Sequence, residues 1–231
     1  MEPQESRSPL KETQILDGAA MVFARDGFGR ASMSQIAAAA GVSKGTLYNY
    51  FPGKEALFAA WVQRECSVRI ALIFDDLTAT ARPAETLRRI GRRMLEMLLS
   101  DSGLLVYRMV VAEAGHFPSL AEAFFAAGPQ RAVASLAGWI RSQVAAGTLA
   151  VNDAEFAAEQ LFSLMQTRLL MRRRLGLQDG VQSPQIEHVV DEAVTLFLRG
   201  YGATARDAGQ GGPPNAYNAA LKAESDGERQ A

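Results

Sequence analysis

The chain has 231 residues, with 24 lysines and arginines against 25 aspartates and glutamates, and a formal net charge of −1. This balance excludes a molecule whose whole surface attracts nucleic acid, so any basic surface has to be local. The single cysteine, Cys66, excludes an intrachain disulfide, and no apolar run reaches the roughly 18 residues that a membrane span needs. The polar start MEPQESRSPLKETQ lacks the apolar segment of a secretory signal. We therefore expect a soluble protein of the cytoplasm, with no membrane partner.

Helix-forming residues dominate, and long alternation of β-branched residues is missing, which predicts an all-α fold of about nine helices. The first helix is predicted from about Leu10 to Asp26, with Gly27 as its left-handed cap. Ser32 and Gln35 have the spacing of a capping box at the start of a short second helix.

The third helix is also short, because Ser43 caps its start and Pro52 disfavours helical geometry at Phe51. A long fourth helix is predicted from about Lys54 to Leu77. Later apolar residues recur at helical spacing in five further segments, 83–100, 102–115, 118–147, 153–175 and 185–201, with a kink or break predicted at Gly128-Pro129.

This pattern predicts four parts of the chain. Residues 1–9 form a disordered leader, residues 10–55 a DNA-binding domain, and residues 56–202 a helical effector-binding and dimerisation domain. Residues 203–231 are rich in Gly, Ala, Pro and charge without apolar periodicity, which is typical of a disordered tail.

The segment GVSKGTLYNYFPGKEAL, residues 41 to 57, joins two short helices through a Gly-Val turn, the arrangement of a helix-turn-helix. Val42 and Leu47 are expected to point into the core. The residues left on the outer side of the third helix can contact phosphates, base edges and thymine methyl groups, and they are Lys44, Gly45, Thr46, Tyr48, Asn49 and Tyr50.

The longer stretch SMSQIAAAAGVSKGTLYNYFPGKEAL resembles the DNA-binding signature of the tetracycline-repressor (TetR) family, and residues 108–149 are similar to its AefR-like C-terminal domain. The resemblance implies a helical homodimer that binds a pseudo-palindromic DNA operator, acts as a repressor, and is released by a small apolar effector. It implies no enzyme activity and no cofactor. The DNA contacts that it implies, with Lys54 on a phosphate, are Arg30, Ser32, Ser34, Ser43, Lys44, Gly45, Thr46, Tyr48, Asn49, Tyr50 and Lys54. One departure is Gly53, where the family commonly has a serine cap.

The second domain offers candidates for an effector pocket and for a dimer interface. Met and aromatic side chains with a few polar groups are typical of a ligand cavity between helices, and the candidates are Met94, Met97, Tyr107, Arg108, His116, Phe117, Phe124, Trp139, Phe162, Met165 and Gln166. The last two helices are expected to pair with their copies in a four-helix interface through Leu161, Leu164, Val190, Val194 and Phe197.

Two alternatives remain open at this point: a DNA-binding protein that responds to no ligand, and a helical enzyme with a vestigial DNA-binding end. Catalysis has little support from the sequence, because no paired carboxylates, Cys-His arrangement or glycine-rich phosphate loop stands out. His116 has no second ligand at metal spacing, so no metal site is expected, and Cys66 is interpreted as a buried, neutral thiol.

Overall fold

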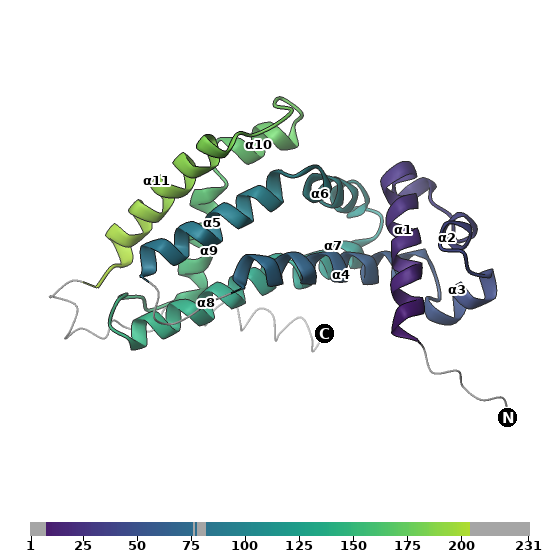
Figure 1. Ribbon diagram of the computed structural model, residues 1–231, viewed down its shortest axis with the longest axis horizontal. Coiled ribbons are helices and arrows are strands. Elements are labelled where there is room, and N and C mark those ends of the chain that lie inside the picture. The colour runs from purple at the N-terminus through teal and green to yellow at the C-terminus, as the bar shows by residue number, and fades with distance from the viewer. Residues whose placement is uncertain (1–7, 76, 78–81, 204–231) are drawn as a thin grey trace. The chain divides into compact units, whose positions relative to one another are not determined.

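The computed structural model describes residues 8–75, 77 and 82–203, and its regular secondary structure is helical throughout this part of the chain. Figure 1 labels the helices, which number eleven in the described residues rather than about nine: α1 Pro9–Arg30, α2 Met33–Ala39, α3 Lys44–Tyr50, α4 Lys54–Phe74, α5 Pro83–Leu99, α6 Asp101–Glu113, α7 Pro118–Ala127, α8 Pro129–Ala145, α9 Ala154–Met165, α10 Leu169–Arg174 and α11 Ser183–Tyr201. The predicted all-α class is confirmed. The leader and tail expected from the sequence fall almost wholly outside the described residues.

The chain forms two compact units, each made of segments that are distant in sequence. The first unit contains the described residues up to Asp75, then Glu96–Ala132 and Leu169–Gly180. The second contains residues 82–95, Val133–Arg168 and residues 181–203. The helix-turn-helix therefore shares a unit with α4, α6, α7 and α10.

In the first unit, α1 lies between the α2–α3 pair and the ends of α4 and α6 (Figure 1). Its regular geometry is interrupted at Gly27, whose φ of 75° and ψ of 168° lie in a region that favours glycine. The positive φ predicted at Gly27 is present, but the predicted end of the helix is wrong, because one further helical turn follows and α1 ends at Arg30.

The predicted starts of α2 and α3 are confirmed by their hydrogen bonds. The Ser32 side chain accepts from the Gln35 amide while the Gln35 side chain accepts from the Ser32 amide, which is a complete capping box. The turn that follows contains Gly41 with a φ of 62°, and Ser43 accepts from the Thr46 amide at 3.0 Å to cap α3.

The α1–α2 contact is very close, because Gly18 faces the end of α2. A Cβ atom on Gly18 would lie 2.6 Å from the amide nitrogen and 2.8 Å from the Cα of Ala40. The Gln14 side chain donates to the Ala40 carbonyl oxygen at 2.6 Å, which fixes the same point of contact. The position of α2 thus depends on a residue that has no side chain.

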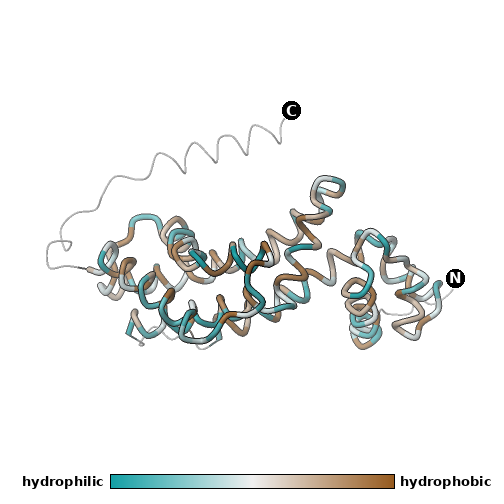
Figure 2. Tube along the Cα trace, turned by 90° about the horizontal axis from the view of Figure 1, so that it is seen from above, coloured by the Kyte–Doolittle hydropathy of each residue, from teal (hydrophilic) through white to brown (hydrophobic). Residues whose placement is uncertain are grey.

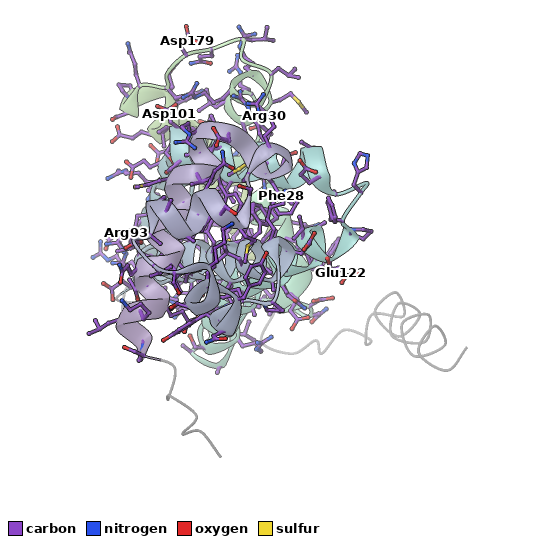
Figure 3. The ribbon with its side chains drawn as sticks, turned by 90° about the vertical axis from the view of Figure 1, so that its right-hand side faces the viewer. Phe28, Arg30, Arg93, Asp101, Glu122 and Asp179 are labelled. Atoms are coloured by element: carbon purple, nitrogen blue, oxygen red, sulfur yellow. The ribbon has the colours of Figure 1, made fainter. Side chains whose placement is uncertain are left out.

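Aromatic side chains fill the core behind this contact. Phe28 lies edge-to-face with Phe58 at a centroid distance of 4.9 Å and with Phe117, the N-cap residue of α7, at 5.4 Å. Phe23 contacts Phe28, Phe58 and Trp61 at centroid distances of 5.2 to 6.0 Å. Phe28, which is labelled in Figure 3, is only 2% exposed. These rings join α1, α4 and α7 into one core.

In the second unit, α5 packs against α9 and α11. The missing side chain of Gly91 makes room for the Met165 thioether and for Val190, which would lie 2.6 Å and 3.1 Å from a Cβ there. Arg88 and Arg92 pair with Asp191 and Glu187 across α5 and α11. Hydrophilic and hydrophobic residues alternate along the helical tube in Figure 2, as expected where helices bury one side.

The predicted break at Gly128-Pro129 is confirmed, since α7 ends at Ala127 and α8 begins at Pro129. The single helix predicted for residues 153–175 is wrong, because α9 ends at Met165 and α10 begins at Leu169. Between them Thr167 donates its hydroxyl to the Leu164 carbonyl, and Arg168 adopts a φ of 62°. A non-glycine residue in this region carries no sequence signal comparable to Gly or Pro.

We expect Gly18→Ala to lower the free energy of unfolding by about 1–3 kcal/mol, because the new methyl group meets the backbone of Ala40, which cannot move without shifting α2. Denaturant unfolding followed by circular dichroism measures this change. Gly138→Ala is the matched control: no atom lies within 4 Å of a Cβ added at this exposed position of α8, so the substitution should stabilise by up to about 1 kcal/mol. Equal effects of the two substitutions would contradict the close α1–α2 contact.

Candidate DNA-binding site

Apolar side chains attach α3, the candidate recognition helix, to the core of the first unit. Leu47 is fully buried, Phe51 at its C-terminal end is 7% exposed, and Val42 packs against the same core from the preceding turn. The structure therefore agrees with the prediction that the side chains of Val42 and Leu47 point into the core. Because the side chains of a helix point outward all around its axis, with about 3.6 residues per turn, burying Leu47 turns the opposite side of α3 to solvent.

That outer side contains four exposed residues of the predicted set, Lys44, Gly45, Tyr48 and Asn49, and Tyr48 is 51% exposed. Between Ala31 and Gly53 the chain has no acidic residue, so the charge that Lys44 brings is not offset by its neighbours in sequence. This surface combines a cation, an amide and an aromatic ring, which are groups that contact phosphates and base edges.

The two hydroxyls at the start of α3 contact each other. The Ser43 and Thr46 hydroxyl oxygens lie 2.8 Å apart, and Ser43 also caps the helix. Each hydroxyl keeps a free lone pair or proton for a phosphate, while its position is set by the cap. Both residues therefore lie where the sequence predicts them, with their side chains in a fixed orientation.

Arg30, Ser32 and Ser34 were also predicted to contact DNA, and all three are exposed. Arg30 lies two residues after Phe28, at the end of α1, and both are labelled in Figure 3. The Arg30 Nε donates to the Asp26 carbonyl oxygen at 3.1 Å. The Ser32 hydroxyl donates to Gln35 at 2.7 Å as part of the capping box. Their contact with DNA stays a prediction.

Tyr50 and Lys54 differ from the exposed residues Lys44 and Tyr48 of α3, because their polar atoms contact the two ends of α1. The Tyr50 ring packs against the core, and its oxygen accepts the Ser8 backbone N–H at 2.8 Å. The Lys54 ammonium donates to three carbonyl oxygens at the end of α1, at distances of 2.7 to 3.1 Å. Both polar groups therefore already have hydrogen-bond partners at the ends of α1.

The structure divides the predicted effector residues between the two units. Six lie in the first unit: Met97, Tyr107, Arg108, His116, Phe117 and Phe124. Phe117 and Phe124 pack against the aromatic core, and His116 is exposed. Arg108 donates to the carbonyls of Arg173 and Arg174, while the Arg174 guanidinium lies 3.8 Å from the Tyr107 ring centroid. Tyr107 and Arg108 thus hold α10 to α6.

The other five effector candidates belong to the second unit: Met94, Trp139, Phe162, Met165 and Gln166. The first four are buried, and Gln166 is half-buried at the C-cap of α9. The Trp139 indole N–H is buried without a hydrogen-bond partner in the described residues, and so is the Thr86 hydroxyl, in a side chain that is 0% exposed. Sequence reasoning missed Thr86, although it stands between apolar positions on the buried side of α5.

Most of the residues predicted to form the dimer interface are buried within a single chain. Leu161, Val190, Val194 and Phe197 are each at most 2% exposed, because α9 and α11 pack against each other and against α5. Those four side chains have no surface left for a second copy, which corrects their predicted place in the interface. Leu164 is half-buried. Helical periodicity identifies a buried side but not the partner that buries it.

Cys66 is 8% exposed in the core of the first unit, and burial raises the pKa of its thiol against the lowering effect of Arg69. The thiol is therefore protonated at neutral pH, as expected from the sequence. No group of three His, Cys, Asp or Glu side chains that could hold a metal ion occurs in the described part of the chain. No helix of that part is long and apolar enough to cross a membrane.

The fold and the exposed side of α3 define the protein as a helix-turn-helix protein with a helical second part. Residues 15–61 match the family model described as bacterial regulatory proteins, tetR family, and residues 85–203 match the AefR-like transcriptional repressor, C-terminal domain. The chain belongs to the TetR family, and the resemblance seen in the sequence is confirmed. Members of this family and the relatives below are DNA-binding transcriptional regulators rather than enzymes.

Similar proteins include a fatty acid metabolism regulator of Bacillus subtilis (strain 168), 30% identical over 96 residues, which are 42% of this chain and 50% of that protein. The chain thus spans about half the length of the curated relatives that it matches. A TetR-family regulator from Mesorhizobium loti MAFF303099 has a TM-score of 0.78 and 28% identity, covering 86% of this chain and 100% of that one. The flavonoid-responsive regulator FrrA has a TM-score of 0.74 and 34% identity over the same shares of the two chains.

Gly45 gives a direct test of the exposed surface. It lies in the first turn of α3, and the only atom near an added Cβ is the Ser43 hydroxyl oxygen at 3.8 Å, so the fold does not need a glycine here. We expect Gly45→Ala to leave the free energy of unfolding unchanged or to raise it by up to about 1 kcal/mol. It should weaken specific DNA binding by about 1–3 kcal/mol, because the methyl group keeps the backbone away from the groove.

Fluorescence anisotropy with a labelled duplex and denaturant unfolding measure the two effects on the same preparation. Gly138→Ala is again the control, since it makes the same chemical change at an exposed position of α8. DNA affinity equal to that of the wild type would exclude close approach of α3 to DNA.

Proposed function

We propose that this chain is a ligand-responsive transcriptional repressor of the cytoplasm that binds a pseudo-palindromic operator as a homodimer. In this proposal residues 10–55 read the DNA, and residues 56–202 bind the effector and the second copy. The observation that carries it is the solvent-facing side of α3, where Lys44, Tyr48 and Asn49 stand together in a stretch without acidic residues. Two such helices in a dimer, one DNA turn apart, suit a palindromic site.

The dimer that we propose uses the outer sides of α9 and α11. Leu164 is the one member of the predicted set with exposed surface. Phe156 and Leu196, on the same two helices, are 43% and 56% exposed and offer apolar area to a second copy. Burying such side chains between copies is the usual basis of a helical dimer interface.

The effector that we propose is a small, mostly apolar molecule with hydroxyl groups, of which a flavonoid is one example. FrrA is described as flavonoid-responsive and is 34% identical to this chain. In the second unit the Thr86 hydroxyl and the Trp139 N–H are buried without a partner among the described residues, and the apolar residues buried in the same unit include Met94, Phe162 and Met165. An unsatisfied buried polar group costs about 1–3 kcal/mol, which a hydroxyl-bearing ligand would recover.

Selection of bound DNA from a random-sequence pool tests the DNA-binding part of the proposal. The wild-type protein should enrich a pseudo-palindrome with half-site centres about one DNA turn apart. Lys44→Ala and Tyr48→Ala should each weaken binding to the enriched duplex by about 1–3 kcal/mol, since each removes a contact between α3 and the DNA. Sedimentation of the complex gives its subunit count. Failure to enrich any sequence would end the proposal.

Thr86→Val tests the effector part. The substitution keeps the shape of the side chain and removes an unpartnered buried hydroxyl, so it should raise the free energy of unfolding by up to about 1 kcal/mol. If the hydroxyl binds the effector, the flavonoid concentration that releases the enriched duplex should rise about three- to tenfold. Thr195→Val, at a half-buried position of α11, is the matched control and should not change that concentration. An unchanged concentration in Thr86→Val would exclude Thr86 from the effector site.

A further inference from the structure

The Lys54 ammonium is fully engaged at the end of α1. It donates to the carbonyl oxygens of Phe28 at 2.7 Å, Gly29 at 3.1 Å and Ala31 at 3.0 Å, and it lies 4.5 Å from the Phe28 ring centroid. A lysine ammonium has three N–H donors, and all three are used here. The carbonyls that accept these hydrogen bonds belong to residues after Gly27, where the regular geometry of α1 is interrupted. The carbonyls at the end of a helix have no amide partners within the helix, so they are available to the Lys54 ammonium.

Tyr50 makes the corresponding contact at the other end of α1. Its oxygen accepts the Ser8 backbone N–H at 2.8 Å and lies 3.5 Å from the Ser8 carbonyl oxygen. Ser8 is the N-cap residue of α1, and its own side chain makes no capping hydrogen bond. The Tyr50 ring packs against the core, so the hydroxyl is carried on a fixed support.

From these contacts we propose that Tyr50 and Lys54 are positioning residues, which fix α3 by holding both ends of α1, and that neither is a DNA ligand. Tyr50 is the last residue of α3 and Lys54 the first of α4, with only Phe51, Pro52 and Gly53 between them. Anchors on both sides of this short connection set the direction in which α3 leaves the core. This inference rests on the proposed DNA-binding function.

A phosphate contact by Lys54 would require the ammonium to leave its three acceptors. Two of these hydrogen bonds, to Phe28 and Ala31, are partly buried, so water replaces the ammonium there poorly. Lys44, by contrast, is exposed on α3. The phosphate contact expected from the sequence at Lys54 is better assigned to Lys44.

Four variants separate positioning from phosphate binding. Lys54→Met keeps the apolar stem and removes the ammonium, whereas Lys54→Arg keeps the positive charge and spreads the donors over a planar fork that cannot reach three converging carbonyls. Tyr50→Phe removes only the hydroxyl. Lys44→Met is the matched control for removal of an exposed lysine from α3.

Binding is measured against the duplex enriched from the random pool and against a scrambled duplex of equal length, over a range of salt concentrations. Positioning predicts that Lys54→Met and Tyr50→Phe lower affinity for the enriched duplex about tenfold, that Lys54→Arg does not restore it, and that binding to the scrambled duplex keeps its salt dependence. Lys44→Met should reduce the slope of log affinity against log salt by about one for each phosphate that the ammonium neutralises in the wild type.

The opposite pattern overturns the proposal. A smaller salt slope for Lys54→Met on the scrambled duplex, with restoration by Lys54→Arg, identifies a phosphate contact. Wild-type affinity of folded Lys54→Met and Tyr50→Phe for both duplexes identifies a role in stability alone. Circular dichroism at the assay temperature establishes whether each variant is folded. If Lys54→Met does not fold, Tyr50→Phe alone distinguishes positioning of α3 from a role in stability.

Hydrogen exchange keeps the inference testable if the wild-type protein enriches no duplex and the proposed function fails. Removal of either anchor should then speed amide exchange in α3 while leaving exchange in α9 unchanged. Equal exchange in α3 of the variants and the wild type would overturn the proposal.

Discussion

The helix that we propose to contact DNA, α3, is too short to be stable alone. The seven residues of α3 make fewer than two turns, and isolated helices of that length do not persist in water. Its existence and its direction therefore come from outside: from the Ser43 cap, from Leu47 in the core, and from the helices around it. Gly18 and the aromatic core matter for DNA binding only because they set the position of these supports.

This dependence explains which parts of the fold could be predicted from the sequence. Caps, turns and breaks are local, so Ser32 with Gln35, Gly41, and Gly128-Pro129 were each sufficient to place a boundary. The separation of α9 from α10 could not be predicted in this way, because Arg168 enters the left-handed region without a glycine or proline to indicate it.

The candidate site was predictable to a different extent. Burial of Leu47 follows from periodicity, and it exposes Lys44 and Tyr48 on the other side of the helix. The roles of Tyr50 and Lys54 do not follow, because a long flexible stem and a ring with one hydroxyl can reach either a phosphate or a backbone carbonyl. The same limit applies to α9 and α11, whose apolar residues suit an interface between copies or a core within one chain.

The composition of the first unit has a consequence for how the chain folds. Phe117 covers Phe28, and Arg173 contacts both the Leu99 carbonyl and Asp101, so the unit that contains α3 also needs segments from the middle and the later part of the chain. During synthesis the N-terminal helices emerge first, yet the contacts that complete their core come from residues translated much later. The helix-turn-helix is local in sequence, whereas the folding unit that supports it is not.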